Sequence, residues 1–217
     1  MATETLIKEP LKTPRAASVA GLLFSVLLFA AFWLLRISVP SDPQEPGAWL
    51  HSGARAVALA INLIPFAAIA FLWFIGVLRS RLGQMEDRFF ATVFFGSGLL
   101  FLAMLFLTSA LTGGVLMAFE AKPAELIGSA TFHFARAVIY ATINIYMVKM
   151  ASVFMITTSR VALYTGIAPR RLAILGFALA LVLLFGSYYI SWSFFVFPIW
   201  VAFISVSILA DNIRHPA

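Results

Sequence analysis

Lys149 is the residue whose position in this sequence most strongly suggests chemistry, because it lies inside a long apolar segment. It is 13 residues from Arg136 and 11 from Arg160, which places it near the middle of a membrane-spanning helix at about 1.5 Å per residue. A central lysine costs about 2.5–3.5 kcal/mol on insertion scales and usually faces a bundle interior or a watery cavity. Two interpretations stay open: an anion-attracting group in a pathway, or a side chain that extends to the interface or links neighbouring helices.

The same segment carries a polar stripe at helical spacing. Four side chains fall at i, i+3, i+7 and i+11: His133, Arg136, Tyr140 and Asn144. They share one face of a helix, and Lys149 falls on roughly the opposite face. The stripe predicts either a polar track that enters the membrane from one surface or a set of hydrogen bonds between helices. Because the segment is polar on two sides, we expect other helices to enclose it at the centre of a bundle.

Asn62 is a second polar candidate, in the preceding part of the chain. Pro65 follows three residues later and leaves a backbone carbonyl of the same helix without its usual donor. Such a site can line a pocket, or a neighbouring helix can satisfy the freed group. The sequence leaves both interpretations open.

Two histidines raise the question of a cofactor. His51 and His133 both fall toward the same predicted membrane surface, and two imidazoles can be the axial ligands of a haem b. The chain contains no Cys, which excludes disulfides, thiolate metal sites and Cys-ligated iron–sulfur clusters. No other metal site and no catalytic residue is predicted, since the sequence motifs of soluble hydrolases, metalloproteases and P-loop enzymes do not occur.

Carboxylates are missing from all of the long apolar segments. This argues against carboxylate proton relays and acidic cation sites inside the membrane. An anion or a lipid headgroup therefore fits the polar inventory better than a cation does.

These residues must be positioned by membrane helices. The chain has 217 residues, 62% hydrophobic and 11% charged, with a mean hydropathy of +0.99, which identifies a membrane protein. We expect a disordered cytoplasmic tail over 1–15 and one all-α domain over 16–212. Its six transmembrane helices are predicted at about 16–39, 55–78, 89–112, 132–158, 171–190 and 194–211. Pro123 could start one short turn, Ser129 is a plausible N-cap, and the third helix could continue, kink or break at Gly113 and Gly114.

The positive charges give the expected orientation. Ten Lys and Arg residues fall on one side: Lys8, Lys12, Arg15, Arg79, Arg81, Arg88, Arg160, Arg170, Arg171 and Arg214. Four fall on the other: Arg36, Arg55, Lys122 and Arg136. Since basic loops stay in the cytoplasm, we expect both termini there, with a bacterial inner membrane as the default location. The dispersed charges do not indicate a nucleic-acid partner, although the basic loops can attract anionic lipid.

Three functions stay open at this point, and none of them favours an enzyme. The first is an accessory or structural membrane component that acts in a homo-oligomer or with another membrane protein. The second is a small transporter or channel for an anionic or amphiphilic solute, with Lys149, Arg136, Asn144, Tyr140 and Asn62 along its pathway. The third is a membrane electron carrier that binds haem between His51 and His133.

Overall fold

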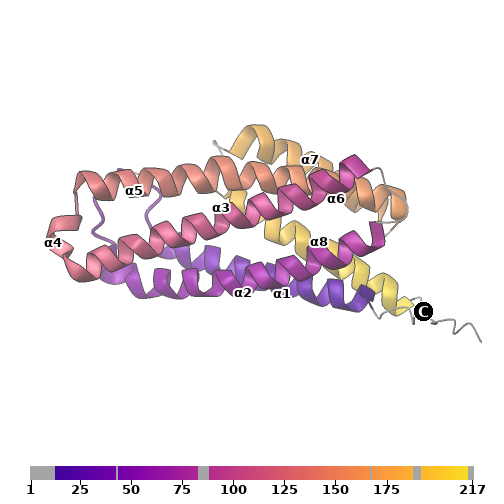
Figure 1. Ribbon diagram of the computed structural model, residues 1–217, viewed down its shortest axis with the longest axis horizontal. Coiled ribbons are helices and arrows are strands. Elements are labelled where there is room, and N and C mark those ends of the chain that lie inside the picture. Colours follow the sequence, from indigo (N-terminus) through magenta and orange to yellow (C-terminus); the bar gives the residue numbers. More distant parts are fainter. Residues whose placement is uncertain (1–12, 43, 83–87, 167, 188–191, 215–217) are drawn as a thin grey trace, which may run out of the picture.

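The computed structural model describes residues 13–42, 44–82, 88–166, 168–187 and 192–214. Over these residues the chain forms helices and no strand (Figure 1). Five helical stretches are long and apolar enough to cross a membrane: Ala16–Ser38, Leu50–Arg79, Phe89–Ala121, Ala130–Tyr164 and Ser193–Asp211. The predicted all-α membrane protein is therefore confirmed at this level. Most of the predicted 1–15 tail lies outside the described residues.

The helices follow one another in the order α1 Thr13–Ser38, α2 Leu50–Leu82, α3 Arg88–Ala121, α4 Pro123–Leu126, α5 Ala130–Ala141, η1 Thr142–Met147, α6 Val148–Thr165, α7 Arg170–Gly186 and α8 Ser193–Arg214. The segment η1 is a π-helix, which joins α5 and α6 without a gap.

Local sequence signals account for several of these boundaries. The Ser129 hydroxyl accepts the backbone N–H of Phe132 at 3.1 Å and caps α5, as predicted. Pro123 begins the short helix α4, also as predicted. Helix α3 continues through Gly113 and Gly114 to Ala121, so the glycine pair does not break it.

The helices differ in length, and this difference creates the space for a site. The continuous stretch Ala130–Tyr164 has 35 residues, whereas α7 has 17. Figure 1 shows α7 and α8 alongside only part of the bundle, while α4, α5 and the neighbouring ends of α2 and α3 extend beyond them. The Ser187 hydroxyl donates to the Asn144 carbonyl at 3.1 Å. The end of α7 therefore lies level with the π-helical segment, halfway along the longer helices.

A phenylalanine cluster holds the centre of the bundle. Five helices each supply one fully or almost fully buried ring: Phe24, Phe71, Phe101, Phe154 and Phe197. Phe24 and Phe71 have ring centroids 4.4 Å apart, and Phe101 and Phe197 lie 4.7 Å apart. An aromatic pair stabilises a fold by about 0.5–1.5 kcal/mol beyond the contribution of its buried area. The contacts between these rings therefore hold α1, α2, α3, α6 and α8 together.

The expected central position of the fourth apolar segment is wrong for α5 and η1, whereas α6 contributes the fully buried Phe154 to the central cluster. Phe134 is 72% exposed and Tyr146 is 57% exposed, and α5 lies at the edge of the bundle in Figure 1. The polar residues of this segment do not need enclosure on every side, because threonine and asparagine side chains satisfy their donors within their own helix. The Thr142 hydroxyl, for example, donates to the Val138 carbonyl at 2.8 Å.

Gly176 marks a close helix contact and supplies a test of the packing. A Cβ atom at this position would meet the Ser159 hydroxyl of α6 and lie 2.7 Å from Trp200 Nε1 of α8. We expect Gly176→Ala to lower the free energy of unfolding by about 1–3 kcal/mol, the usual cost of overpacking a close contact. Gly114→Ala is the matched control, since nothing lies within 4 Å of its Cβ position. Denaturation of both variants in detergent would measure the difference, and equal stabilities would contradict the contact.

Candidate functional site

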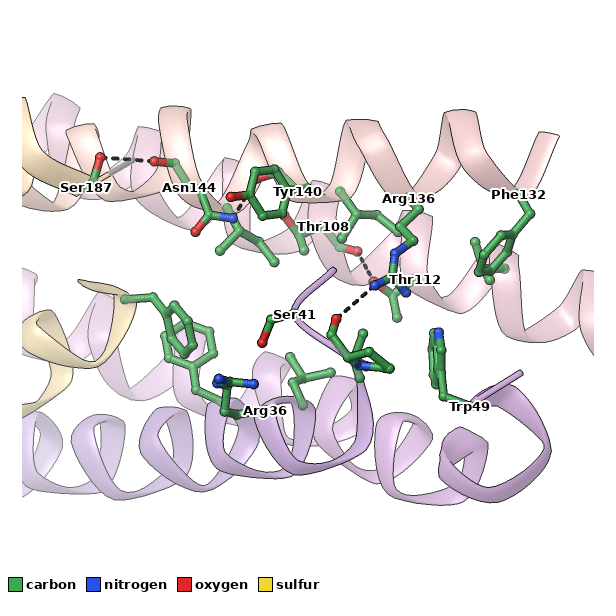
Figure 2. A pocket seen from close by; sticks show the side chains of 18 residues that line it. Arg36, Ser41, Trp49, Thr108, Thr112, Phe132, Arg136, Tyr140, Asn144 and Ser187 are labelled. Carbon is green, nitrogen blue, oxygen red and sulfur yellow. Dashed lines mark hydrogen bonds between the residues drawn. The ribbon is translucent and has the colours of Figure 1, made fainter. Parts of the chain in front are cut away.

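A cavity of about 210 Å³ lies where the α7–α8 hairpin stops short of the longer helices. Its walls come from the end of α1, the following loop, α3, α5, η1 and the start of α8. The polar residues that line it are Arg36, Ser41, Trp49, Thr108, Thr112, Arg136, Tyr140, Asn144 and Ser187. Figure 2 shows Arg36 reaching into this space from α1 and Arg136 from α5.

Arg136 fastens the loop between α1 and α2 to α5. Its Nη2 atom donates to the carbonyls of Pro40, at 2.8 Å, and Asp42. Its Nη1 atom lies 3.7 Å from a carboxylate oxygen of Glu45. The Glu45 carboxylate also accepts the backbone N–H groups of Gly47 and Ala48, at 3.0 and 2.9 Å. The arginine therefore has a structural role, and its Nη2 donors are already engaged.

Arg36 is the less compensated of the two arginines. Its guanidinium carbon lies 4.8 Å from the ring centroid of Trp192, a cation–π contact. Its Nε atom is buried and has no hydrogen-bond partner among the described residues. A guanidinium in a cation–π contact keeps its in-plane N–H groups available. Arg36 can therefore hold an aromatic ring and still donate to a ligand.

Unpaired buried donors concentrate around this cavity. Within the described part of the chain, seven buried side-chain N or O atoms lack a hydrogen bond, and four of them belong to three lining residues. They are Arg36 Nε, Trp49 Nε1, Arg136 Nε and Arg136 Nη1. No aspartate or glutamate is among the 18 lining residues. The cavity therefore offers N–H donors and positive charge without a carboxylate in its own lining.

Several hydroxyl and amide groups of the lining already donate to backbone carbonyls. Thr108 and Thr112 donate to carbonyls four residues back in α3, at 2.9 and 2.8 Å. The Asn144 side-chain amide donates to the Tyr140 carbonyl at 3.0 Å. These donors are engaged by the local backbone, so the arginines, Trp49 and the hydroxyls of Ser41 and Tyr140 are the lining groups that can hold a ligand.

The π-helical segment shapes one wall of the cavity. The Val148 N–H bonds to the Ile143 carbonyl, five residues back, so this turn is wider than an α-helical turn. Ile143 and Asn144 both line the cavity. Single π-helical turns occur frequently at functional sites, and here the turn lies beside the end of α7.

The structure brings together three of the five residues predicted along a solute pathway. Arg136, Tyr140 and Asn144 line the cavity. Lys149 lies on an exposed part of α6, five residues or about 7.5 Å beyond Asn144. Asn62 is exposed on α2 and donates to the Ala58 carbonyl at 2.7 Å. Neither of these two residues lines the cavity.

The two histidines do not line the cavity either. His51 is exposed at the start of α2, and its ring centroid is 5.2 Å from that of Phe119 in α3. His133 is half-buried in the first turns of α5, beside Phe132. Haem ligation by these imidazoles stays a prediction.

Sequence reasoning missed Arg36 and Trp49 as site residues. Arg36 counted only toward the orientation, although an arginine in the last turn of an apolar helix can face a cavity as easily as solvent. Trp49 follows Pro46 and Gly47 in a turn-rich loop, and nothing in its local sequence indicates a buried indole. The useful signal is the pair Arg36 and Arg136, which the charge pattern assigns to the same end of the bundle.

No protein family, curated protein or solved structure matches this chain. The chemistry of the cavity is therefore the basis for a functional assignment. Two guanidinium groups and an indole N–H, in a lining without a carboxylate, are suited to bind an anion.

Proposed function

We propose that this chain is a membrane protein whose cavity binds the anionic group of a small solute or amphiphile. The observation that carries this proposal is the set of four buried N–H donor atoms on Arg36, Trp49 and Arg136 that have no hydrogen bond within the described part of the chain; one of them, Arg136 Nη1, lies 3.7 Å from the Glu45 carboxylate. A buried donor without a partner costs about 1–3 kcal/mol, and more when it is charged. An anion that accepts these donors would remove that cost, so its binding is favoured over an empty or apolar-filled cavity.

The size of the cavity narrows the ligand class. Binding sites for drug-sized molecules commonly measure about 300–1,000 Å³, whereas this cavity measures about 210 Å³. It suits a phosphate or carboxylate on a small body. Guanidinium groups bind both of these anions through paired N–H donors.

The cavity favours the anionic-solute interpretation over the other two functions. A purely accessory component has no need of uncompensated donors in a cavity, and a haem site would use the imidazoles of His51 and His133, which lie elsewhere. Three of the predicted pathway residues line the proposed binding cavity: Arg136, Tyr140 and Asn144. The proposal concerns binding of the anion in the cavity and does not include its transport across the membrane.

The direct test is ligand-dependent stabilisation of the purified protein in a detergent with a neutral headgroup. We expect glycerol phosphate to raise the melting temperature in a saturable manner, because a ligand that binds only the folded state stabilises it. Glycerol at the same concentration is the uncharged control. Equal effects of the two compounds would contradict anion binding.

We propose six membrane spans, with α7 as the fifth along the chain, within one domain over 16–212. The support is the apolar sequence of α7 and the position of α7 and α8 as a hairpin against α6 and α1. The distribution of Lys and Arg supports cytoplasmic termini, and we keep the bacterial inner membrane as the proposed location because the chain is compact and its loops are short. The cavity would then open on the non-cytoplasmic side.

The lack of native Cys makes this topology simple to test. We expect Gln44→Cys, in the loop after α1, to react with a membrane-impermeant maleimide added to intact spheroplasts. Ala217→Cys should react only after the membrane is opened. The reverse pattern would overturn the proposed orientation, and labelling of both sites in intact spheroplasts would overturn the six-span count.

A further inference from the structure

We infer that the anionic group belongs to a membrane lipid, whose acyl chain lies in an apolar groove on the outer face of α1 and α8. This inference rests on the proposed anion binding and adds the source and orientation of the ligand. It is carried by a second hollow, which is separate from the cavity but shares a wall with it.

The second hollow is a groove made entirely by apolar side chains: Phe29, Trp33, Trp192, Phe195, Val196 and Ile199. Trp33 is 46% exposed and Trp192 is 48% exposed, so the groove faces the surroundings of the bundle. Their ring centroids are 6.4 Å apart. Tryptophans gather where a membrane helix meets the interface, which places this groove beside lipid chains.

Two contacts connect the groove to the cavity. Trp192 lines the groove, and its ring lies 4.8 Å from the guanidinium carbon of Arg36, which lines the cavity. Phe195 lines the groove and lies 4.6 Å, between ring centroids, from Phe194, which lines the cavity. The two hollows therefore lie side by side, and a molecule with a charged end and a chain would have to pass over this wall to occupy both.

The chemistry of the two hollows matches the two parts of an anionic lipid. The cavity has space for a headgroup and carries the guanidinium of Arg36, whereas the groove is lined by aromatic and aliphatic side chains and carries no charged group. A water-soluble anion would leave the groove unused. The described end of α7 lies level with Asn144, so the cavity and the groove lie at the same height of the bundle.

Photolabelling in lipid vesicles tests this inference. The probe is phosphatidylglycerol with a diazirine on one acyl chain, and the control probe is phosphatidylcholine with the same chain. We expect the anionic probe to label the groove segments of α1 and α8 about fivefold more than the control probe does, because one arginine attracts an anionic lipid by about 1 kcal/mol. Arg36→Met should abolish this excess.

A variant that fills the groove tests the binding of the acyl chain independently of the binding of the headgroup. Ile199→Trp should reduce labelling of the groove by the anionic probe, since the larger side chain occupies the space of the acyl chain. Val206→Trp is the matched control, two helical turns along the same face of α8 and outside the groove. Both positions are exposed, so neither substitution disturbs the core.

The outcomes distinguish this inference from the function on which it rests. If glycerol phosphate binds but the two probes label the groove equally, the ligand is a soluble anion and the lipid inference is overturned. If the excess labelling survives Arg36→Met, the headgroup does not bind in the cavity and the inference is also overturned. If glycerol phosphate does not bind and no excess labelling occurs, both proposals fail.

Discussion

Arg136→Met is expected to lower the free energy of unfolding by about 3 kcal/mol. The substitution removes the donors to the carbonyls of Pro40 and Asp42 and the positive charge beside Glu45. Each buried acceptor left without a partner costs about 1–3 kcal/mol, and the loss of one member of a buried ion pair adds to this. The Glu45 carboxylate keeps two backbone N–H partners, which limits the total. Denaturation in detergent would measure the change.

The loop itself supplies a second measurement. The amide groups of Gly47 and Ala48 donate to Glu45, and we expect their hydrogen exchange to accelerate in Arg136→Met because the loop is no longer held to α5. Arg136→Lys should be intermediate, since an ammonium keeps the charge but loses the paired donors. Arg55→Met is the control, as Arg55 is an exposed arginine near the same end of the bundle. Unchanged exchange in Arg136→Met would show that Arg136 does not hold the loop.

The elements of this fold could be predicted from sequence because membrane helices are defined locally. An apolar stretch, a capping serine and a proline at a helix start act over a few residues. These signals gave the long apolar helices, the Ser129 cap and the start of α4 at Pro123. The positions of the helix ends along the bundle axis are set instead by contacts between segments that are distant in the sequence. No local pattern indicates that the end of α7 lies level with Asn144.

Lys149 is a candidate site residue whose position in the membrane depends on how the helices are placed relative to one another. Its distance from Arg136 and Arg160 was used to place it at mid-membrane, on the assumption that both arginines mark the membrane surfaces. The bond between Ser187 and Asn144 puts Lys149 about 7.5 Å from the level where the α7–α8 hairpin ends. A lysine stem can extend to an interface at that distance. This position agrees with the interpretation in which the side chain extends to the interface, and a role of Lys149 in a pathway stays a prediction.

The cavity contains Arg136, which the sequence predicted as a site residue, and Arg36, which it did not. Arg136 belongs to the polar stripe, and its partners Pro40 and Asp42 are more than 90 residues away, so only the folded chain shows that it holds the loop. Within the described part of the chain, the Nε donor of Arg36 has no hydrogen-bond partner. The two arginines therefore have different roles. Arg136 holds the loop that forms one wall of the cavity, and Arg36 is the better placed of the two to bind an anion there.

We expect Arg36→Met to weaken the binding of glycerol phosphate by roughly 30-fold, which corresponds to about 2 kcal/mol for the loss of one buried charged donor. Arg36 lies beside Trp192 at the shared wall of the cavity and the groove. Its Nε donor has no partner among the described residues, so the substitution removes ligand contacts without breaking a hydrogen bond of the fold. Calorimetric titration of the protein in neutral detergent would measure the affinity.

The division between the two arginines makes this prediction specific. Arg36→Met should change the affinity strongly and the free energy of unfolding little, because only the cation–π contact with Trp192, typically about 0.5–1 kcal/mol, is lost. Arg36→Lys should retain part of the affinity, since it keeps the charge without the planar donors. Arg55→Met should bind as the unaltered protein does. If Arg36→Met binds equally well, the anion is not held by Arg36, and the donors of Trp49 and Arg136 alone would have to account for the site.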